Sequence, residues 1–323
     1  MEGAFSPRIH PRPAYPPSTA FVYVVFKEVF VQAGLHGPLA CLALFSLYTR
    51  VANAVLPYLR NRIPAALDPD ALFFTLCVSV VHTLLWALCN FSFLAFDRCN
   101  LLRRYKIERK GFEVAGAPLM SRMFADAAVS QLVTGPILAY ALYPVARRLG
   151  MGAYADPLPP FLTMSTVFVV SHVANAFGFY WTHRALHHRA LYKLWHKKHH
   201  EFKGTVGFAA EFAHPVEVAL SNQLPTLAGA LLCGTHPLCV FVWLAFRLQQ
   251  TYEAHSGFCF QGALLNGFPF FLLHAEAAAH HDHHHTTNLG NFGGYTDWIF
   301  GTQDHYCAIG GEDGYLKSRR AEK

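Results

Sequence analysis

Long apolar stretches alternate with short polar segments along this chain. A helix needs about 20 predominantly apolar residues to cross the hydrocarbon core of a bilayer. Four stretches of that length predict four transmembrane helices in two hairpins, and they lie near 29–48, 71–96, 123–145 and 161–181. The pattern therefore predicts an all-α, polytopic membrane protein.

A fifth apolar region, about 216–246, differs from these four because prolines and glycines interrupt it. Pro225, Gly229, Gly234 and Pro237 leave each half short for a full span. We therefore expect a shallow or re-entrant helix pair in this region. Such a pair would pack as a hydrophobic lid against the polar segments on either side of it in the sequence.

Composition indicates a chain that is partly surrounded by lipid. Hydrophobic residues make up 53% of the sequence and charged residues only 14%, with a formal net charge of +6. The basic residues gather beside apolar segments and form no aromatic-interleaved module, which argues against nucleic acid as a partner. The eight cysteines are scattered without a CxxC pair. This predicts reduced thiols and metal chemistry carried by other ligands.

Charge also predicts the orientation of the spans. The segment 97–122 carries seven Lys or Arg residues against three acidic ones, and the positive-inside rule places it in the cytosol. The stretch after 181 then faces the cytosol as well. Residues 1–20 hold five prolines and lack the apolar core of a signal peptide, so we expect a disordered cytosolic tail and no cleaved leader.

Histidines are concentrated in the second half of the chain, where sixteen of the twenty fall between His183 and His305. Residues three or four apart lie on one face of a helix, so histidines with this spacing point together. Three clusters have the spacing: His183 and His187; His196, His199 and His200; and His281, His284 and His285. One such pair would often be incidental, but three coincide here. We predict that eight neutral imidazoles converge on a metal centre.

The number of imidazoles indicates which metals they would hold. Eight are too many for one tetrahedral zinc ion and match two ions with open positions for oxygen and substrate. Zinc cannot reduce oxygen, whereas iron can, and a site beside apolar helices suits attack on an inert lipid C–H bond. The hydrolase motif HExxH is absent. We therefore expect two iron ions and molecular oxygen as co-substrate.

A membrane metal transporter or sensor is an alternative from a different class of protein. Transporters place their ligands within the spans, near the bilayer midplane. Of the twenty histidines, only His36, His82 and His172 fall inside the predicted spans, and none of the three belongs to a cluster. The pattern therefore favours an enzyme.

The ordered motifs HxxxH, HxxHH and HxxHH resemble the fatty acid hydroxylase/sterol desaturase superfamily, and the closest likeness is to its C-4 methylsterol oxidase branch. The likeness covers about 165–306, and its segments are YWTHRALHHRALYKLWHKKHHEF (180–202), AAEFAHPVE (209–217), RLQQTYEAHSGF (247–258), HHDHHH (280–285) and DWIFGT (297–302). It implies a four-span membrane fold whose cytosolic, histidine-rich helical cap holds a non-haem diiron site. It further implies NAD(P)H electrons delivered by a cytochrome-b-type carrier and its reductase, in the endoplasmic reticulum membrane.

The resemblance also implies a ninth ligand, a division of the chain and an activity. The histidine of the HSG motif falls on His255 and joins the eight cluster histidines. The division is a tail at 1–20, a transmembrane region at 21–160, a catalytic domain at 161–306 and a C-terminal tail at 307–323. The activity is a monooxygenase acting on the C-4 methyl group of sterols. Sterol C-5 desaturase and fatty-acid or sphingolipid hydroxylase stay open as alternatives, because these enzymes differ in substrate more than in site.

This chain departs from the pattern of its relatives by two substitutions, by a short insertion around 274–278 and by a shorter loop between Asn291 and Asp297. Asn175 and Ala176 stand where relatives carry an acidic pair before the first cluster, and Gln250 replaces a glutamate. Every cluster histidine is present, so we expect these changes to affect ligand orientation and substrate selectivity more than metal capture.

Five further residues are weaker candidates for supporting the centre. His172 shares a helix face with the first cluster, although a hydrogen-bonded core histidine is an equal alternative. Glu211 and His214 could orient ligands or line the pocket, or instead cap and pack before a proline. His280 lies inside the third cluster but off its frame. Asp282 is expected to accept an N–H from a ligand imidazole and so fix its tautomer, with a simple surface carboxylate as the alternative.

Overall fold

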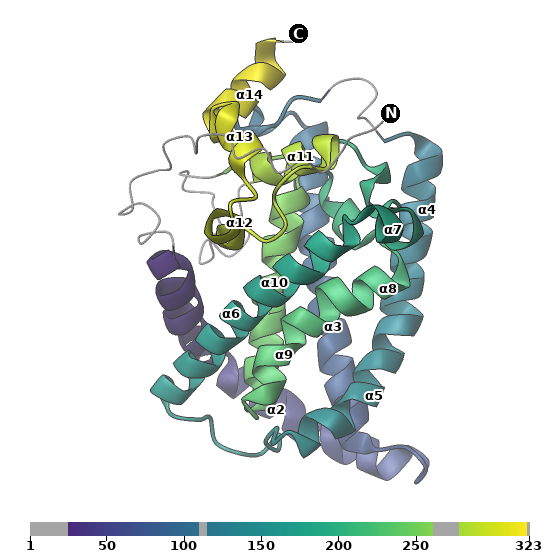
Figure 1. Cartoon of the computed structure of the whole chain (residues 1–323). Helices are drawn as coiled ribbons and strands as arrows, with labels where there is room; N and C mark the ends of the chain where they lie inside the picture. Colours follow the sequence, from purple (N-terminus) through teal and green to yellow (C-terminus); the bar gives the residue numbers. More distant parts are fainter. Residues whose placement is uncertain (1–24, 110–114, 261–277, 322–323) are drawn as a thin grey trace.

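The computed structural model describes residues 25–109, 115–260 and 278–321, and in that part the chain forms helices, turns and one isolated antiparallel bridge between Lys106 and Phe258. Long helices form an elongated bundle, and short helices gather at one end of it (Figure 1). The predicted all-α class is confirmed. The predicted tail at 1–20 lies outside the described residues.

Four helical segments are long and apolar enough to cross a membrane, as predicted. They are Val29–Arg62, Pro69–Arg98, Ala117–Arg148 and Phe161–Leu186. The elements that form them are η1 (Phe26–His36) with α2 (Gly37–Arg62), α3 (Pro69–Arg98), α4 (Ala117–Val129) with η4 (Ser130–Thr134) and α5 (Gly135–Arg148), and α6 (Phe161–Leu186). Large apolar side chains such as Leu132 and Leu162 are more than three-quarters exposed. Their exposure is favourable where the surrounding medium is lipid.

Three of the helices widen into a π-helix directly before a proline. η1 precedes Pro38, η4 precedes Pro136, and η8 (Val218–Gln223) precedes Pro225. Proline lacks an N–H, and its ring clashes with the carbonyl four residues earlier in a regular helix. A wider turn moves that carbonyl aside, so each helix continues through its proline.

The region 216–246 folds into two helical arms, as predicted. The first arm is α8 (Pro215–Glu217), η8 and α9 (Leu224–Leu232), and the second is α10 (Pro237–His255). The chain does not break at Pro225 or Gly229, because the π turn accommodates the proline and Gly229 lets α9 approach α6. A Cβ at Gly229 would lie 2.3 Å from the Cα of Ser171. The two arms are joined by a turn in which Gly234 has a φ of +56°.

This turn lies far from the histidine-rich end of the molecule. The N–H of Gly152, in the loop between α5 and α6, donates to the carbonyl of Thr235 at 3.2 Å. α6 starts after that loop and carries His183 at its opposite end, about 33 Å away at 1.5 Å per residue. The two arms therefore run along the length of the spans. The expectation of a shallow helix pair was wrong, and the pair is deeply inserted among the spans.

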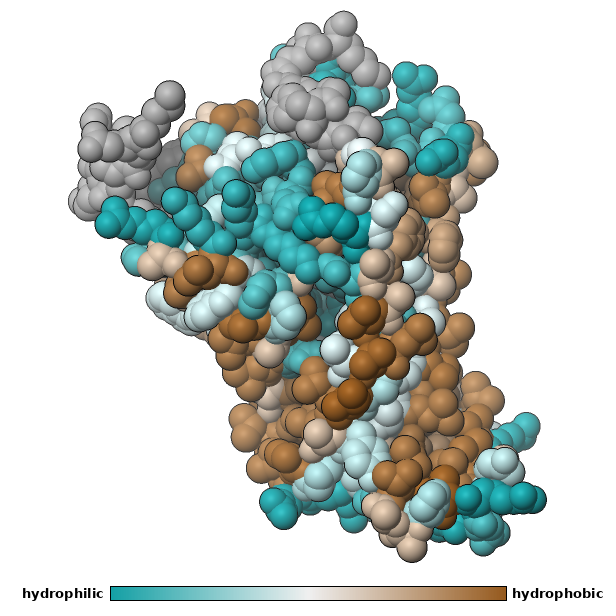
Figure 2. Space-filling view, turned by 90° about the vertical axis from the view of Figure 1, so that its right-hand side faces the viewer, coloured by the Kyte–Doolittle hydropathy of each residue, from teal (hydrophilic) through white to brown (hydrophobic). Residues whose placement is uncertain are grey.

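Short helices form a polar cap on the other end of the bundle, where Figure 2 shows a hydrophilic surface above a hydrophobic body. The cap consists of η2 (Arg103–Tyr105), α7 (Arg189–Leu191), η5 (Tyr192–His196), η6 (His199–Glu201), η7 (Gly207–Glu211), α11 (Ala278–Thr287), α12 (Tyr295–Phe300), α13 (Asp304–Ala308) and α14 (Gly311–Ala321). α14 lies in the segment predicted as a C-terminal tail, and its Tyr315 hydroxyl donates to Asp282 on α11 at 2.8 Å. This part of the tail is therefore a docked helix.

Candidate metal centre

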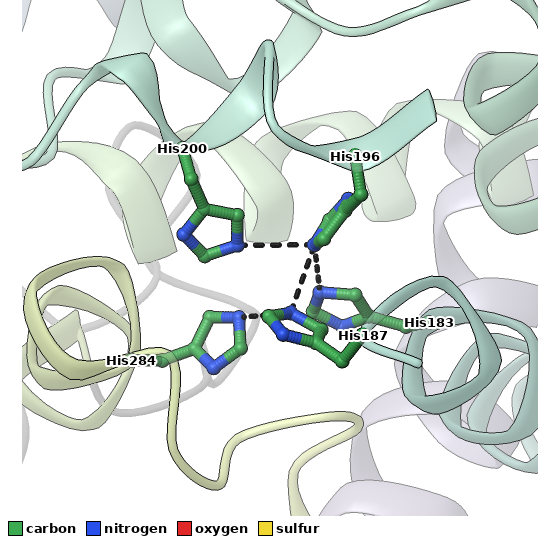
Figure 3. A group of neighbouring side chains, drawn as sticks. All are labelled: His183, His187, His196, His200 and His284. Carbon is green, nitrogen blue, oxygen red and sulfur yellow. Dashed lines mark hydrogen bonds between the residues drawn. The ribbon is translucent and has the colours of Figure 1, made fainter. Parts of the chain in front are cut away.

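Five histidines from three parts of the chain meet in a first group (Figure 3). They are His183 at the end of α6, His187 just after it, His196 and His200 around η5 and η6, and His284 on α11. The Nε2 atom of His196 lies 3.2, 2.8 and 3.0 Å from the Nε2 atoms of His183, His187 and His200. The Nε2 atoms of His187 and His284 are 3.1 Å apart.

Four histidines form a second group beside the first, and they are His199, His255, His281 and His285. The Nε2 atom of His255 lies 2.8 Å from that of His281 and 3.4 Å from that of His199. Ring centroids of His200 and His285 are 4.6 Å apart, so the two groups adjoin. The structure thus brings together all nine residues that the sequence and its resemblance nominated as ligands.

Hydrogen bonds at the outer ring nitrogens hold several of these rings in place. The Nδ1 atoms of His183 and His285 bond backbone carbonyls at 3.2 and 2.9 Å, and His255 Nδ1 bonds the carbonyl of Thr251 at 2.8 Å. His281 Nδ1 bonds the side-chain oxygen of Asn291 at 2.7 Å. A ring that donates through Nδ1 keeps the lone pair of Nε2 free, and in both groups this atom points inward.

His196 differs from the other rings because its outer nitrogen faces a carboxylate. Its Nδ1 atom lies 2.9 Å from an oxygen of Glu217, although the ring is not aligned for a straight hydrogen bond. The other oxygen of Glu217 is buried without a hydrogen-bond partner in the described part of the chain. A carboxylate behind a metal-binding imidazole raises the basicity of that ring.

The electrostatics of the two groups favour a bound cation. Burial lowers the pKa of His196 to about 3, and burial is also the main cause that lowers those of His199 and His281 to about 4. The rings are therefore neutral at cellular pH, and their inward lone pairs repel one another. Nitrogens about 3 Å apart have the separation of neighbouring ligands that lie about 2.1 Å from one ion at right angles. The donor set therefore fits a metal ion in each group.

The weaker candidates lie around these groups and belong to neither of them. His172 is a buried core residue that stacks on Tyr295, with ring centroids 5.8 Å apart. His214 caps α8, because its ring accepts a hydrogen bond from the N–H of Val216 at 3.2 Å. This agrees with the alternative that His214 caps a helix before a proline. His280 is buried and stacks on a tyrosine of α13 at 4.2 Å.

The hydrogen bonds of Asp282 correct the prediction that this carboxylate accepts an N–H from a ligand imidazole. One carboxylate oxygen accepts from the N–H and the hydroxyl of Thr205, both at 2.9 Å, and the other accepts from Tyr315. Arg319 lies 3.7 Å from that second oxygen. These bonds occupy the carboxylate, so Asp282 fixes the loop at Thr205 and the helix α14 instead of orienting an imidazole.

A largely apolar cavity of about 410 Å³ opens below the metal groups. It lies between α5 with η4 and the first re-entrant arm, and Figure 2 shows a hollow where the hydrophobic body meets the cap. Phe179 and Thr251 line it, one helical turn before His183 and His255. Glu211 lines the cavity as well, in agreement with the alternative that this residue lines the pocket. A lipid in this cavity would therefore reach the histidines.

Of the two substitutions that distinguish this chain from its relatives, one lies in the wall of this cavity and the other contacts a residue of that wall. Asn175 lines the cavity, and its side-chain oxygen accepts from Thr226 at 3.1 Å. Gln250 accepts at 2.6 Å from Arg247, which lines the cavity too. Asn175 thus bears directly on what the cavity accommodates, and Gln250 bears on it through Arg247.

Comparison with known proteins agrees with this geometry. Residues 168–302 match the sequence model of the fatty acid hydroxylase family. Methylsterol monooxygenase 2-2 of Arabidopsis thaliana is 33% identical over 233 residues, which cover 70% of this chain and 84% of the relative. The chain belongs to the fatty acid hydroxylase family. The resemblance stated from the motifs is thereby confirmed.

Other relatives in the family carry two kinds of name. A putative methylsterol monooxygenase of Dictyostelium discoideum is 33% identical, over 71% of this chain and 85% of its own length. Very-long-chain aldehyde decarbonylase GL1-11 of Oryza sativa is 31% identical, over 72% and 86%. No solved structure matches the chain. These relatives support a membrane-associated oxidoreductase that acts on lipid.

Three residues of this site were not nominated from the sequence as site residues. Glu217, Asn291 and His82 each acquire their role from a partner far along the chain, namely His196, His281 and Glu211. His82 and Asn291 have no histidine three or four residues away, and the histidine three residues before Glu217, His214, belongs to neither metal group. Only Glu217 lay inside a segment noted for its resemblance to the family.

Proposed function

We propose that this fatty acid hydroxylase family member is a non-haem diiron monooxygenase that oxidises the C-4 methyl group of sterols. The observation that carries the proposal is the juxtaposition of nine inward-facing imidazole nitrogens with the end of an apolar cavity. The names of the methylsterol monooxygenase relatives support the substrate. Catalysis is assigned to residues 161–306 and membrane anchoring mainly to 21–160.

The residues of the chain would divide the work between holding metal and excluding water. His183, His187, His196, His200 and His284 would hold one iron ion, and His199, His255, His281 and His285 the other. Bound iron would supply the activation of oxygen that attack on an unactivated C–H bond requires. The apolar wall of the cavity would position the lipid and keep water from the reacting carbon.

Orientation and electron supply are part of the same proposal. Two residues of the basic segment 97–122 contact the histidine-rich end, where Lys106 bridges to Phe258 and Arg122, on α4, pairs with Glu201 at 2.8 Å. A cytosolic position of this basic segment would place the metal centre in the cytosol, at the endoplasmic reticulum membrane. Electrons from NAD(P)H would then arrive through a cytochrome-b-type carrier and its reductase, as the family resemblance implies.

The test is the sterol profile of cells that lack their own C-4 methylsterol oxidase and express this chain. Mass spectrometry should show that the intact protein clears 4-methyl sterols and that the double variant His196→Ala, His200→Ala does not. The matched control is His188→Ala, an exposed neighbour of the first cluster outside both metal groups, which should clear them like the intact chain.

Other lipid changes would redirect the assignment. An unchanged 4-methyl sterol content with a new ring double bond would indicate a C-5 desaturase. New 2-hydroxy acyl chains would indicate a fatty-acid or sphingolipid hydroxylase. Loss of all lipid changes together with altered metal uptake would leave the transporter alternative. Each result contradicts C-4 oxidation.

A further inference from the structure

A row of basic side chains lies on the outer surface of the segment that carries His196. Arg189, Lys193 and Lys197 follow one another at intervals of four residues, which is about one helical turn, and all three are exposed. None of the three forms an ion pair with another described residue. Leu194 lies among them in the chain and is 64% exposed. These three cations are called the basic row below.

The basic row keeps its positive charge because the acidic residues around it are engaged by other cations. Residues 157–200 contain five Lys or Arg residues and no Asp or Glu. At the end of this segment, Glu201 pairs with Arg122 and Asp126 pairs with Lys198. Positive potential on a surface attracts and orients a partner that has an acidic face. The row therefore favours an acidic protein as its partner.

The segment that carries the basic row also forms a wall of the first metal group. The ring of Tyr192 lies against three imidazoles of that group, with ring centroids 5.7 to 5.9 Å apart. They belong to His187, His196 and His200. A protein bound to the row would therefore be about one helix diameter, roughly 10 Å, from these histidines. A lipid headgroup gains nothing from this position, whereas an electron carrier needs a short path to the metal.

We propose that the basic row is the surface on which the reductant of the metal centre docks, a one-electron carrier protein with an acidic face around its redox group. The inference rests on the proposed function and deepens it by naming the surface that the carrier uses. Conversion of a C–H bond and oxygen to an alcohol and water consumes two electrons and two protons, so a one-electron carrier must dock and leave twice per round. A small apolar contact at Leu194 with charges around it suits such a transient interface.

Binding of a soluble carrier domain to the purified full-length protein tests this inference without turnover. The probe is a cytochrome-b-type haem domain with an acidic face. The protein is held in nanodiscs of zwitterionic phosphatidylcholine, so that the lipid contributes no net charge. Binding should weaken about tenfold between about 20 and 200 mM salt, because screening shortens the range of the attraction between exposed charges.

Two double variants locate the contact. Lys193→Glu with Lys197→Glu should weaken binding at low salt by about fivefold or more, because two attractions are lost and two repulsions appear. The matched control is Arg103→Glu with Arg104→Glu, which changes the net charge equally at two exposed positions. The carbonyl of Arg104 accepts from Arg320 on α14, and α14 lies well apart from α7 on the cap (Figure 1). The control should weaken binding by about twofold at most.

The outcomes separate this inference from the proposed function. Equal binding by the Lys193→Glu, Lys197→Glu variant and the unchanged protein overturns the docking surface, and so does binding that salt does not weaken. C-4 oxidation in cells would still stand, because clearance of 4-methyl sterols is measured separately. Unchanged carrier binding together with less anionic phospholipid retained on purification would mean that the row contacts headgroups, which also overturns the inference. If the variant does not fold, Lys193→Gln with Lys197→Gln removes the two charges without adding others, and the same measurement decides.

Discussion

Replacing Glu217 should weaken metal binding without weakening the fold. Its carboxylate oxygen lies 2.9 Å from His196 Nδ1, and both side chains are buried. Removing an outer partner of a metal-binding imidazole typically costs 10- to 100-fold in metal affinity, or about 1.4 to 2.7 kcal/mol. We expect a loss of that size for Glu217→Ala and the lower end of it for Glu217→Gln, whose amide oxygen still accepts.

The stability of the metal-free protein should change in the opposite direction. Burial raises the pKa of Glu217 from 4.5 to about 7. The unfolded chain releases this proton at lower pH than the folded chain, so the group destabilises the metal-free fold increasingly as pH rises from 4.5 to 7. At pH 8 the effect is about 3 kcal/mol at most. Glu217→Gln removes it, so the metal-free variant should melt at the same or a higher temperature.

The assay is competition for Fe²⁺ with a chelator under anaerobic conditions, together with a melting curve of the metal-free protein. The matched control is Glu201→Gln, a glutamate next to His200 whose carboxylate pairs with Arg122 at the surface. Its metal affinity should not change. An unchanged affinity in Glu217→Ala would refute the reasoning, and a parallel loss of affinity and stability would show misfolding instead.

Three further predictions concern acid stability, packing and orientation. Burial holds the pKa of His196 near 3 and is the main cause that holds the pKa of His199 near 4. The unfolded chain therefore binds more protons than the folded chain below pH 6.5, and the metal-free protein should melt at a lower temperature as the pH falls from 6.5 to 4. A melting temperature that does not change over this range would contradict buried neutral rings. Gly229→Ala should destabilise the fold by about 1–3 kcal/mol or more, because the new Cβ would lie 2.3 Å from the Cα of Ser171. The control Gly116→Ala should not destabilise it, because the nearest atom to its new Cβ is 3.7 Å away. Equal melting temperatures of the two variants would disprove the close helix crossing. In sealed microsomes, an impermeant maleimide should label the exposed Cys99 and not the exposed Cys233; the reverse pattern would invert the proposed orientation.

The sequence predicts the spans and the cluster histidines well because both depend on local periodicity. A window of about 20 apolar residues is sufficient to place a membrane helix, and spacings of three and four place imidazoles on one face. His255 has no histidine at such a spacing on its own helix, so only the resemblance nominated it. Its partners His199 and His281 become visible as neighbours only when α10 packs against the cap.

The error at Asp282 has a geometric cause. Adjacent residues on a helix point about 100° apart, so Asp282 does not share the face of His281, His284 and His285 on α11. Its carboxylate instead meets Thr205 and the C-terminal helix. Proximity in sequence to a ligand therefore does not imply contact with the metal site.

The π turn before Pro225 also sets the rotation of the helix that contains it. A π turn holds about one residue more than an α turn, and one residue rotates everything beyond it by about 100°. Glu217 before the turn faces His196, and Gly229 after it faces Ser171 on α6. Deleting one residue from Val218–Gln223 would restore a regular helix and yet make these two contacts incompatible. The length of this one segment thus fixes how the helix is rotated at the metal end relative to the membrane end. Natural variants should therefore delete a residue from this segment only together with a compensating insertion.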